Sequence, residues 1–177
     1  MRKLASYLFV SLDGVVDTPN QYVRGESYAD IPDDSVLQQD AVLLGRKTYE
    51  EWANFWPGST IEPFATFINN TPKFVVSSTL REVGWQYSTL IARDFLGEVT
   101  KLKSQPGKTI GVHGSVSLTQ SLLLAGLLDE LCLVQCPAIA GSGRHLLDHG
   151  GPPVQLDLMS SRTTPSGLHL LVYSPRR

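Results

Sequence analysis

Three short apolar runs in this chain are each followed at once by small or polar residues and then by a segment of helical character. The three junctions are Leu44-Gly45-Arg46-Lys47-Thr48, Val76-Ser77-Ser78-Thr79 and Val112-His113-Gly114-Ser115. Continuous apolar runs of this length are typical of strands that are covered on both faces, as in a parallel sheet. The repeated order of strand, turn and helix therefore predicts an α/β fold on a mostly parallel central sheet.

The remaining segments extend this pattern. Apolar runs predict strands over Leu4–Ser11, Ala41–Leu44, Lys73–Ser78, Ser88–Ile91, Thr109–His113, Leu131–Ala138, Val154–Ser161 and Leu168–Ser174. Spacing and end signals predict helices from Asp33 or Asp34 to Gln39, over Tyr49–Phe55, Glu62–Asn69 and Phe95–Ser104 with Asp94 as its cap, and over Ser117–Ala125 with Gly126 at its end. Pro19–Pro32 is expected to be a long loop. Because no helix separates the last three strands, they are expected to form an antiparallel C-terminal edge, with the helices flanking the sheet.

Length and composition limit the kind of protein. A chain of 177 residues is long enough for one domain and short for two, so residues 1–177 are expected to form a single domain. The 15 basic and 17 acidic residues nearly balance, which gives no support to a nucleic-acid partner. Charged residues make up only 18% of the chain, below the usual ~25%, so part of the surface is expected to lie against a second subunit.

No segment has the character of a membrane span or a secretion signal. The first apolar run, Leu4–Val10, is short, and Ser6 and Tyr7 interrupt it. Cys132 and Cys136 lie four residues apart in a predicted strand, about 13 Å from each other, which is beyond the reach of a disulfide. A soluble cytoplasmic protein with reduced thiols is therefore expected.

The three junctions carry groups that suit phosphate. Ligands of open α/β sheets bind beyond the carboxyl ends of the strands, where helix N-termini offer free N–H groups. Gly45 and Gly114 let the backbone approach a ligand closely, and Arg46 can form two parallel hydrogen bonds with a phosphate. Further charge and hydroxyl groups come from Lys47, Thr48, Ser77, Ser78, Thr79 and Ser115. Together the junctions predict a phosphate-rich ligand.

Other kinds of site lack their motifs. The chain contains neither the nucleotide P-loop G-x-x-x-x-G-K-[ST], nor the dinucleotide motif G-x-G-x-x-G, nor the serine hydrolase motif G-x-S-x-G. His145 and His149 have a spacing that suits a metal ion on a helix. However, Gly150-Gly151-Pro152 follows at once and no third ligand is evident, so no metal site is predicted.

Asp13 and His113 each admit two interpretations. Asp13 follows the first strand and precedes Gly14, and Asp-Gly is a common turn pair. Asp13 is equally interpreted as an acid that faces a substrate or positions a loop. His113 ends a strand beside Gly114, and a partly buried ring bonded to the backbone is favoured there over a catalytic role.

Several stretches, taken in order, carry a family resemblance. They are SLDG (Ser11–Gly14), LLGRKTYEEW (Leu43–Trp52), FVVSST (Phe74–Thr79), GVHGSVSLTQSLL (Gly111–Leu123), AGLLDELCL (Ala125–Leu133) and GSGRHLL (Gly141–Leu147). The sequence resembles the dihydrofolate-reductase-like superfamily, and within it the group similar to the C-terminal reductase domain of riboflavin biosynthesis. GSGRHLL is similar to the glycine loop of that group.

This resemblance implies a dihydrofolate-reductase-like fold that binds NADPH in extended form across the sheet. By analogy, Gly45, Arg46, Lys47 and Thr48 would hold phosphates, and Ser77, Ser78 and Thr79 would lie near the adenosine 2′-phosphate. Gly111, Gly114, Ser115 and Val116 would surround the pyrophosphate and the nicotinamide side. Members of the family commonly form homodimers. The cations and hydroxyls of the junctions agree with a 2′-phosphate, because an NAD site would instead place an acid on the ribose.

The function expected from these features is an NADPH-dependent reductase. It would transfer a hydride to a small heterocyclic or carbonyl substrate, such as a 5-amino-6-ribosylamino-pyrimidine or a pterin, with Asp13 on the substrate side. The proton would come from water or from the substrate, and no catalytic acid is predicted. Two alternatives are a non-catalytic module that binds a nucleotide or another ligand, and a dimeric structural protein.

Overall fold

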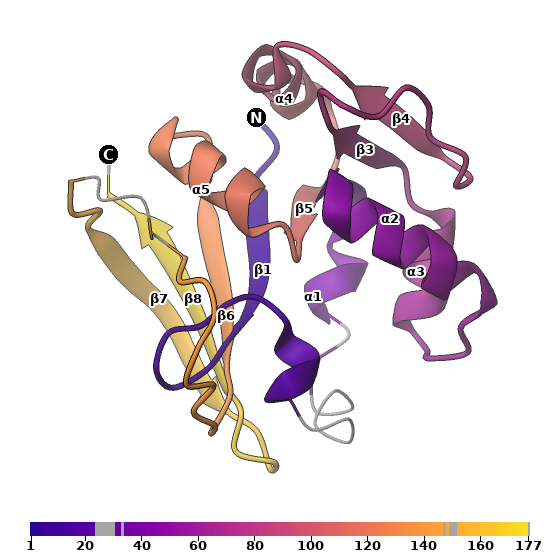
Figure 1. Cartoon of the computed structure of the whole chain (residues 1–177). Coiled ribbons are helices and arrows are strands. Elements are labelled where there is room, and N and C mark those ends of the chain that lie inside the picture. Colours follow the sequence, from indigo (N-terminus) through magenta and orange to yellow (C-terminus); the bar gives the residue numbers. More distant parts are fainter. Residues whose placement is uncertain (24–30, 33, 147, 149–151, 177) are drawn as a thin grey trace.

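The computed structural model describes residues 1–23, 31–32, 34–146, 148 and 152–176. These residues form one eight-stranded sheet in the order β4-β3-β2-β5-β1-β6-β8-β7, with β7 and β8 at one end and β3 and β4 at the other (Figure 1). The strands are β1 (Leu4–Val10), β2 (Gln39–Gly45), β3 (Lys73–Val76), β4 (Ser88–Ile91), β5 (Thr109–His113), β6 (Glu130–Gln135), β7 (Leu156–Thr163) and β8 (His169–Pro175).

The sheet is parallel except at its C-terminal edge. Strands β4, β3, β2, β5, β1 and β6 pair in parallel, whereas β8 pairs antiparallel with both β6 and β7. The predicted fold class is therefore confirmed. Parallel pairing also brings the carboxyl ends of neighbouring strands to one edge of the sheet, which is where the candidate site lies.

Helices cover both faces of the parallel part. Helices α4 (Phe95–Ser104) and α5 (Val116–Leu124) share a core with Ala41 and Leu43 of β2. Val42 and Leu44 point to the other face, where the core includes residues of α2 (Arg46–Phe55) and α3 (Phe64–Asn70). This arrangement explains the continuous apolar run Ala41–Leu44 within β2, since side chains on alternate sides of the strand are all buried there.

The remaining elements are short. Helix α1 (Asp34–Leu37) precedes β2, and the 3-10 helices η1 (Pro19–Gln21) and η3 (Trp56–Gly58) lie in connections. Asp33 and part of the predicted loop Pro19–Pro32 fall outside the described residues. Both cysteines are free thiols, and no helix of the described residues is long and apolar enough to cross a membrane.

Two of the three junctions differ from prediction. Helix α2 begins at Arg46 and not at Tyr49. Gly45 ends the strand in an extended conformation, and none of the next three residues, Arg46 to Thr48, is a glycine or proline that would delay the start of the helix. After β3 no helix begins at all. The Ser77 hydroxyl accepts hydrogen bonds from the N–H groups of Thr79 (3.2 Å) and Leu80 (3.0 Å). Such local bonds to a serine favour a turn over a helix.

Candidate functional site

The junctions after β2 and β5 are bonded to each other. The Ser115 hydroxyl accepts a hydrogen bond from the Gly45 N–H (2.7 Å) and donates one to the Thr48 hydroxyl (3.1 Å). We call these three residues, Gly45, Thr48 and Ser115, the β2–β5 clasp. A Cβ at position 45 would lie 3.1 Å from the Ser115 oxygen, a tight contact that would require Ser115 to shift by a few tenths of an ångström. The clasp therefore brings the first turns of α2 and α5 together at the carboxyl edge.

We expect Ser115→Ala to lower the free energy of unfolding by about 2 kcal/mol, because the partly buried Gly45 N–H would lose its acceptor. Ser121→Ala is the matched control, since the Ser121 hydroxyl is exposed on the same helix. Its change should stay within about 0.5 kcal/mol. Urea unfolding followed by circular dichroism measures both, and equal stability of the two variants would contradict a structural role for the clasp.

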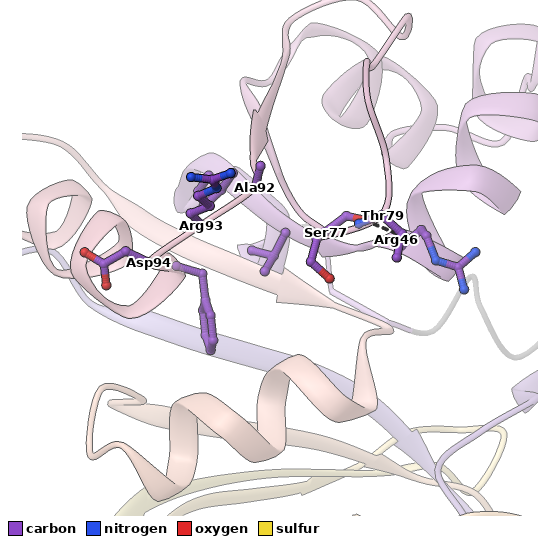
Figure 2. A pocket seen from close by; sticks show the side chains of 10 residues that line it. Arg46, Ser77, Thr79, Ala92, Arg93 and Asp94 are labelled. Atoms are coloured by element: carbon purple, nitrogen blue, oxygen red, sulfur yellow. Dashed lines mark hydrogen bonds between the residues drawn. The ribbon is translucent and has the colours of Figure 1, made fainter.

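A cavity of about 430 Å³ lies beside the clasp, at the ends of β3 and β4. Arg46 lines it from the start of α2, and Arg93 from the segment after β4. The Arg46 guanidinium extends away from the other lining residues, and its Nη1 bonds to Glu50 one turn along the helix (2.8 Å). Figure 2 shows these two side chains on either side of Ser77 and Thr79. The residues that line it are Arg46, Val76, Ser77, Ser78, Thr79, Ile91, Ala92, Arg93, Asp94 and Phe95. Four of the predicted cofactor residues thus share one cavity.

Arg93 was not among the predicted site residues. It lies two residues after β4, which pairs in parallel with β3, so it reaches the same edge as the Ser77–Thr79 turn. A signal for it exists in the sequence, because Ile91 ends a predicted strand just as the other junctions do. Lys47, by contrast, is exposed on the first turn of α2 and is not a lining residue of the cavity.

Gly111 lies apart from the other predicted cofactor residues. It is inside β5, two residues before the strand ends, and the Gln39 side chain lies over it so closely that a Cβ would overlap with the amide oxygen. Val116 is the first residue of α5, but its side chain is buried in a small core with Val10 and Val16. Gly114 adopts a positive φ of 61° between β5 and α5, at the clasp.

His113 is buried and neutral. Its Nε2 is 2.8 Å from the Gln39 amide oxygen, so the expected backbone partner is wrong. The ring stacks on Tyr7 at a centroid distance of 5.0 Å, and the rings of Trp52 and Phe64 also lie within 6 Å of it. Burial lowers the pKa of His113 to about 4. A buried imidazole held in this way has a structural role.

Asp13 holds a loop. Its Oδ1 accepts hydrogen bonds from the Ser11 hydroxyl (2.6 Å) and the Ala140 N–H (2.9 Å), and its Oδ2 accepts one from the Gly141 N–H (2.8 Å). The bond from Ser11, followed by those from the two amides, holds the pKa of this carboxyl well below its usual range. Of the roles left open by the sequence, these bonds favour loop positioning.

The histidines do not form a metal centre in the part of the chain that is described. His145 Nε2 lies 3.1 Å from the Asp13 carbonyl oxygen, and His149 falls outside the described residues. No group of three or more potential metal ligands occurs among the residues with a described position.

Comparison with known proteins identifies relatives along almost the whole chain. The sequence model of the RibD C-terminal domain family matches residues 2–170 of this chain. The uncharacterized protein YyaP of Bacillus subtilis (strain 168) is 31% identical over 182 residues, which cover 97% of this chain and 94% of YyaP.

Solved structures share the fold. A protein from Shewanella sp. PV-4, described as a putative riboflavin biosynthesis protein, superposes with a TM-score of 0.77 at 18% identity, over 99% of each chain. Dihydrofolate reductase from Enterococcus faecalis, in complex with NADP(H), has a TM-score of 0.66 at 11% identity, over 99% of this chain and 97% of that one. These findings confirm both the expected dihydrofolate-reductase-like fold and the resemblance carried by the sequence motifs. The chain belongs to the RibD C-terminal domain family.

Proposed function

We propose that this protein is an NADPH-dependent reductase that transfers a hydride to a small heterocyclic or carbonyl substrate. Membership of the RibD C-terminal domain family supports a reductase-like function. One observation carries the choice of cofactor. Arg46 and Arg93 line a single cavity with the hydroxyl groups of Ser78 and Thr79, at the edge of the sheet where open α/β proteins bind nucleotides.

The cavity fits the adenosine 2′-phosphate that distinguishes NADPH from NADH. Arg46 and Arg93 bring planar groups of fixed positive charge, which suit a phosphate dianion. Arg46 is paired with Glu50, so a phosphate would have to share its guanidinium or displace this exposed carboxylate. A site for NADH would instead offer a free acid to the ribose hydroxyls. The acid that lines this cavity, Asp94, accepts a bond from the Gly97 N–H as the cap of α4. Its carboxylate therefore serves the helix.

The clasp fits the pyrophosphate. It joins the starts of α2 and α5, and the positive ends of two helix dipoles meet there. Gly114 presents no side chain at this point. An extended dinucleotide that ran from the cavity past the clasp would thus meet Arg46 and Arg93 at one end and helix N–H groups further along.

The protein's own residues would bind and orient the reactants. When bound, the nicotinamide supplies the hydride, so the chain need not provide covalent chemistry. Neither Asp13 nor His113 is suited to act as a proton donor. The first is ionised and accepts three hydrogen bonds, and the second is buried, neutral and bonded to Gln39. We therefore assign proton delivery to water or to the substrate.

Titration of the protein with NADPH and NADH, followed by tryptophan fluorescence, tests the proposal. We expect NADPH to bind more tightly, and Arg46→Ala or Arg93→Ala to weaken NADPH about tenfold while leaving NADH unchanged. Arg162→Ala, on the exposed edge strand β7, is the control for general loss of positive charge. Absence of binding by both dinucleotides would refute the proposal. Binding without oxidation across pterins, pyrimidine ribosides and quinones would indicate a non-catalytic ligand-binding module instead.

We also propose that the protein acts as a homodimer, which the low charged fraction of 18% supports. Light scattering coupled to size-exclusion chromatography measures the mass directly against the 19.4 kDa of one chain. A monomeric mass at micromolar concentration would contradict this assignment.

A further inference from the structure

Two segments at the carboxyl edge of the sheet are bound to each other. One is the turn after β1, residues 11–18, and the other is the loop after β6, residues 138–146, which we call the clamped loop. The Leu12 N–H donates to the Ala138 carbonyl (2.7 Å), and the Val16 N–H donates to the Arg144 carbonyl (2.9 Å). The Asp13 carboxylate receives two further bonds from amides of the clamped loop. The turn after β1 therefore sets the position of the clamped loop.

Gly143 permits this close contact. Its φ is 139°, and a Cβ at this position would overlap with the Val15 side chain and lie 2.6 Å from Asp17 Oδ1. The same Asp17 oxygen accepts a hydrogen bond from the Arg144 N–H (3.0 Å). The backbone on both sides of Arg144 is thus fixed against the turn, so the direction of the Arg144 side chain is set by the clamped loop.

The Arg144 side chain extends to the first turn of α5. Its Nη2 donates a hydrogen bond to the Ser117 hydroxyl (3.1 Å), and Ser117 is the second residue of that helix. No salt bridge among the described residues involves Arg144. A guanidinium has five N–H donors, so this bond to Ser117 leaves donors for an anion.

Helix α5 brings no cation of its own to this place. Its sequence, VSLTQSLLL, contains no basic residue. The hydroxyl of its N-cap residue Ser115 makes no capping bond, because it belongs to the clasp. The first N–H groups of the helix therefore lack a side-chain cap, and the bond to Ser117 brings the positive charge of Arg144 to this first turn.

From these contacts, and resting on the proposed function, we infer that Arg144 binds the pyrophosphate of the dinucleotide at the first turn of α5. Asp13 is a positioning residue for this contact. It holds the clamped loop through the amides of Ala140 and Gly141, and the clamped loop holds Arg144 beside Ser117. The predicted substrate-side acid thereby acts on cofactor binding without touching the cofactor.

Binding of three ligands separates this contact from the 2′-phosphate cavity. NADPH and NADH both carry the pyrophosphate, whereas adenosine 2′-monophosphate carries only the 2′-phosphate. Arg144→Gln should weaken NADPH and NADH by the same factor, about tenfold, and leave adenosine 2′-monophosphate unchanged. Arg93→Ala should weaken NADPH and adenosine 2′-monophosphate and leave NADH unchanged, and Arg162→Gln on β7 should change none of the three. Arg144→Lys should recover part of the loss, since it restores the charge.

The role of Asp13 needs its own readout. Asp13→Asn should weaken the binding of both dinucleotides as Arg144→Gln does. The double variant should lose little more affinity than either single variant, because both changes interrupt the same chain of contacts from Asp13 through the clamped loop to Arg144. Hydrogen exchange should quicken at the amides of Ala140 and Gly141 in Asp13→Asn but not in Arg144→Gln. Faster exchange with unchanged dinucleotide affinity would refute the positioning role.

The outcomes distinguish the two proposals. If the unaltered protein binds NADPH and Arg144→Gln binds it equally well, the role of Arg144 is refuted while the proposed function stands. If the unaltered protein binds neither dinucleotide, both are refuted. Equal weakening of NADPH and NADH by Arg144→Gln, with adenosine 2′-monophosphate unaffected, supports the contact with the pyrophosphate.

Discussion

Lowering the pH from 6.5 to 4 should reduce the free energy of unfolding by about 3 kcal/mol through His113 alone. In the folded protein, burial lowers the pKa of this ring to about 4, from an ordinary value of 6.5. Between these two values the unfolded chain binds a proton that the folded protein does not. Each fall of one pH unit in this range therefore lowers the free energy of unfolding by about 1.4 kcal/mol. The decrease ends below pH 4, where both the folded and the unfolded state are protonated.

Urea unfolding at half-unit steps of pH, compared with the variant His113→Gln, isolates this contribution. The variant keeps a polar side chain beside Gln39 but has no proton to gain, so its stability should fall less steeply between pH 6.5 and 4. His169→Gln, at an exposed position on β8, is the control and should retain the steep fall. Equal slopes in the protein and in His113→Gln would show that the buried ring does not cause the acid sensitivity.

Gly111→Ala should destabilise the protein by about 3 kcal/mol, because the new methyl group would occupy the place of the Gln39 amide. A Cβ at this position would also lie 2.8 Å from His113 Nε2. Gln39 is buried and cannot turn away into solvent, so its bond to the buried His113 ring would break. Both overpacking and the lost hydrogen bond contribute to the expected loss.

Thermal unfolding measures this effect, and a loss of this size should lower the melting temperature by about 10 °C. Gly84→Ala is the matched control, because a Cβ at position 84 meets no atom within 4 Å. Its stability should change by less than about 0.5 kcal/mol. A melting temperature of Gly111→Ala equal to that of Gly84→Ala would contradict the packing of Gln39 over the glycine.

The apolar pattern predicts the parallel strands well because both of their faces are buried. Ser88–Ile91 and Thr109–His113 are predicted with the same bounds as β4 and β5, and Asp94 caps α4 as expected. The order of the strands has no such local signal. Strand β1 pairs with β5 and β6, whose residues come much later in the chain, so the sheet order follows only from the structure.

The candidate site could be predicted in part for the same reason. Arg46 and Ser78 are predicted because they lie where an apolar run of the sequence ends, and both line the same cavity. Arg93 is a single arginine after a weak strand, and it becomes a candidate only once β4 is placed beside β3. Gly111 appears in a glycine-containing motif, but its neighbour Gln39 comes from β2. Contacts between segments far apart in the sequence decided each of these cases.

The position of β1 in the middle of the sheet has a consequence for biosynthesis. When the chain leaves the ribosome, residues 4–10 emerge long before residues 109–135, which supply both neighbouring strands. At the usual speed of translation, about 5–20 residues per second, this apolar segment waits on the order of ten seconds for its partners. We expect the nascent segment to be a binding site for chaperones during that interval, so slow translation of the middle of the chain should lower the yield of folded protein.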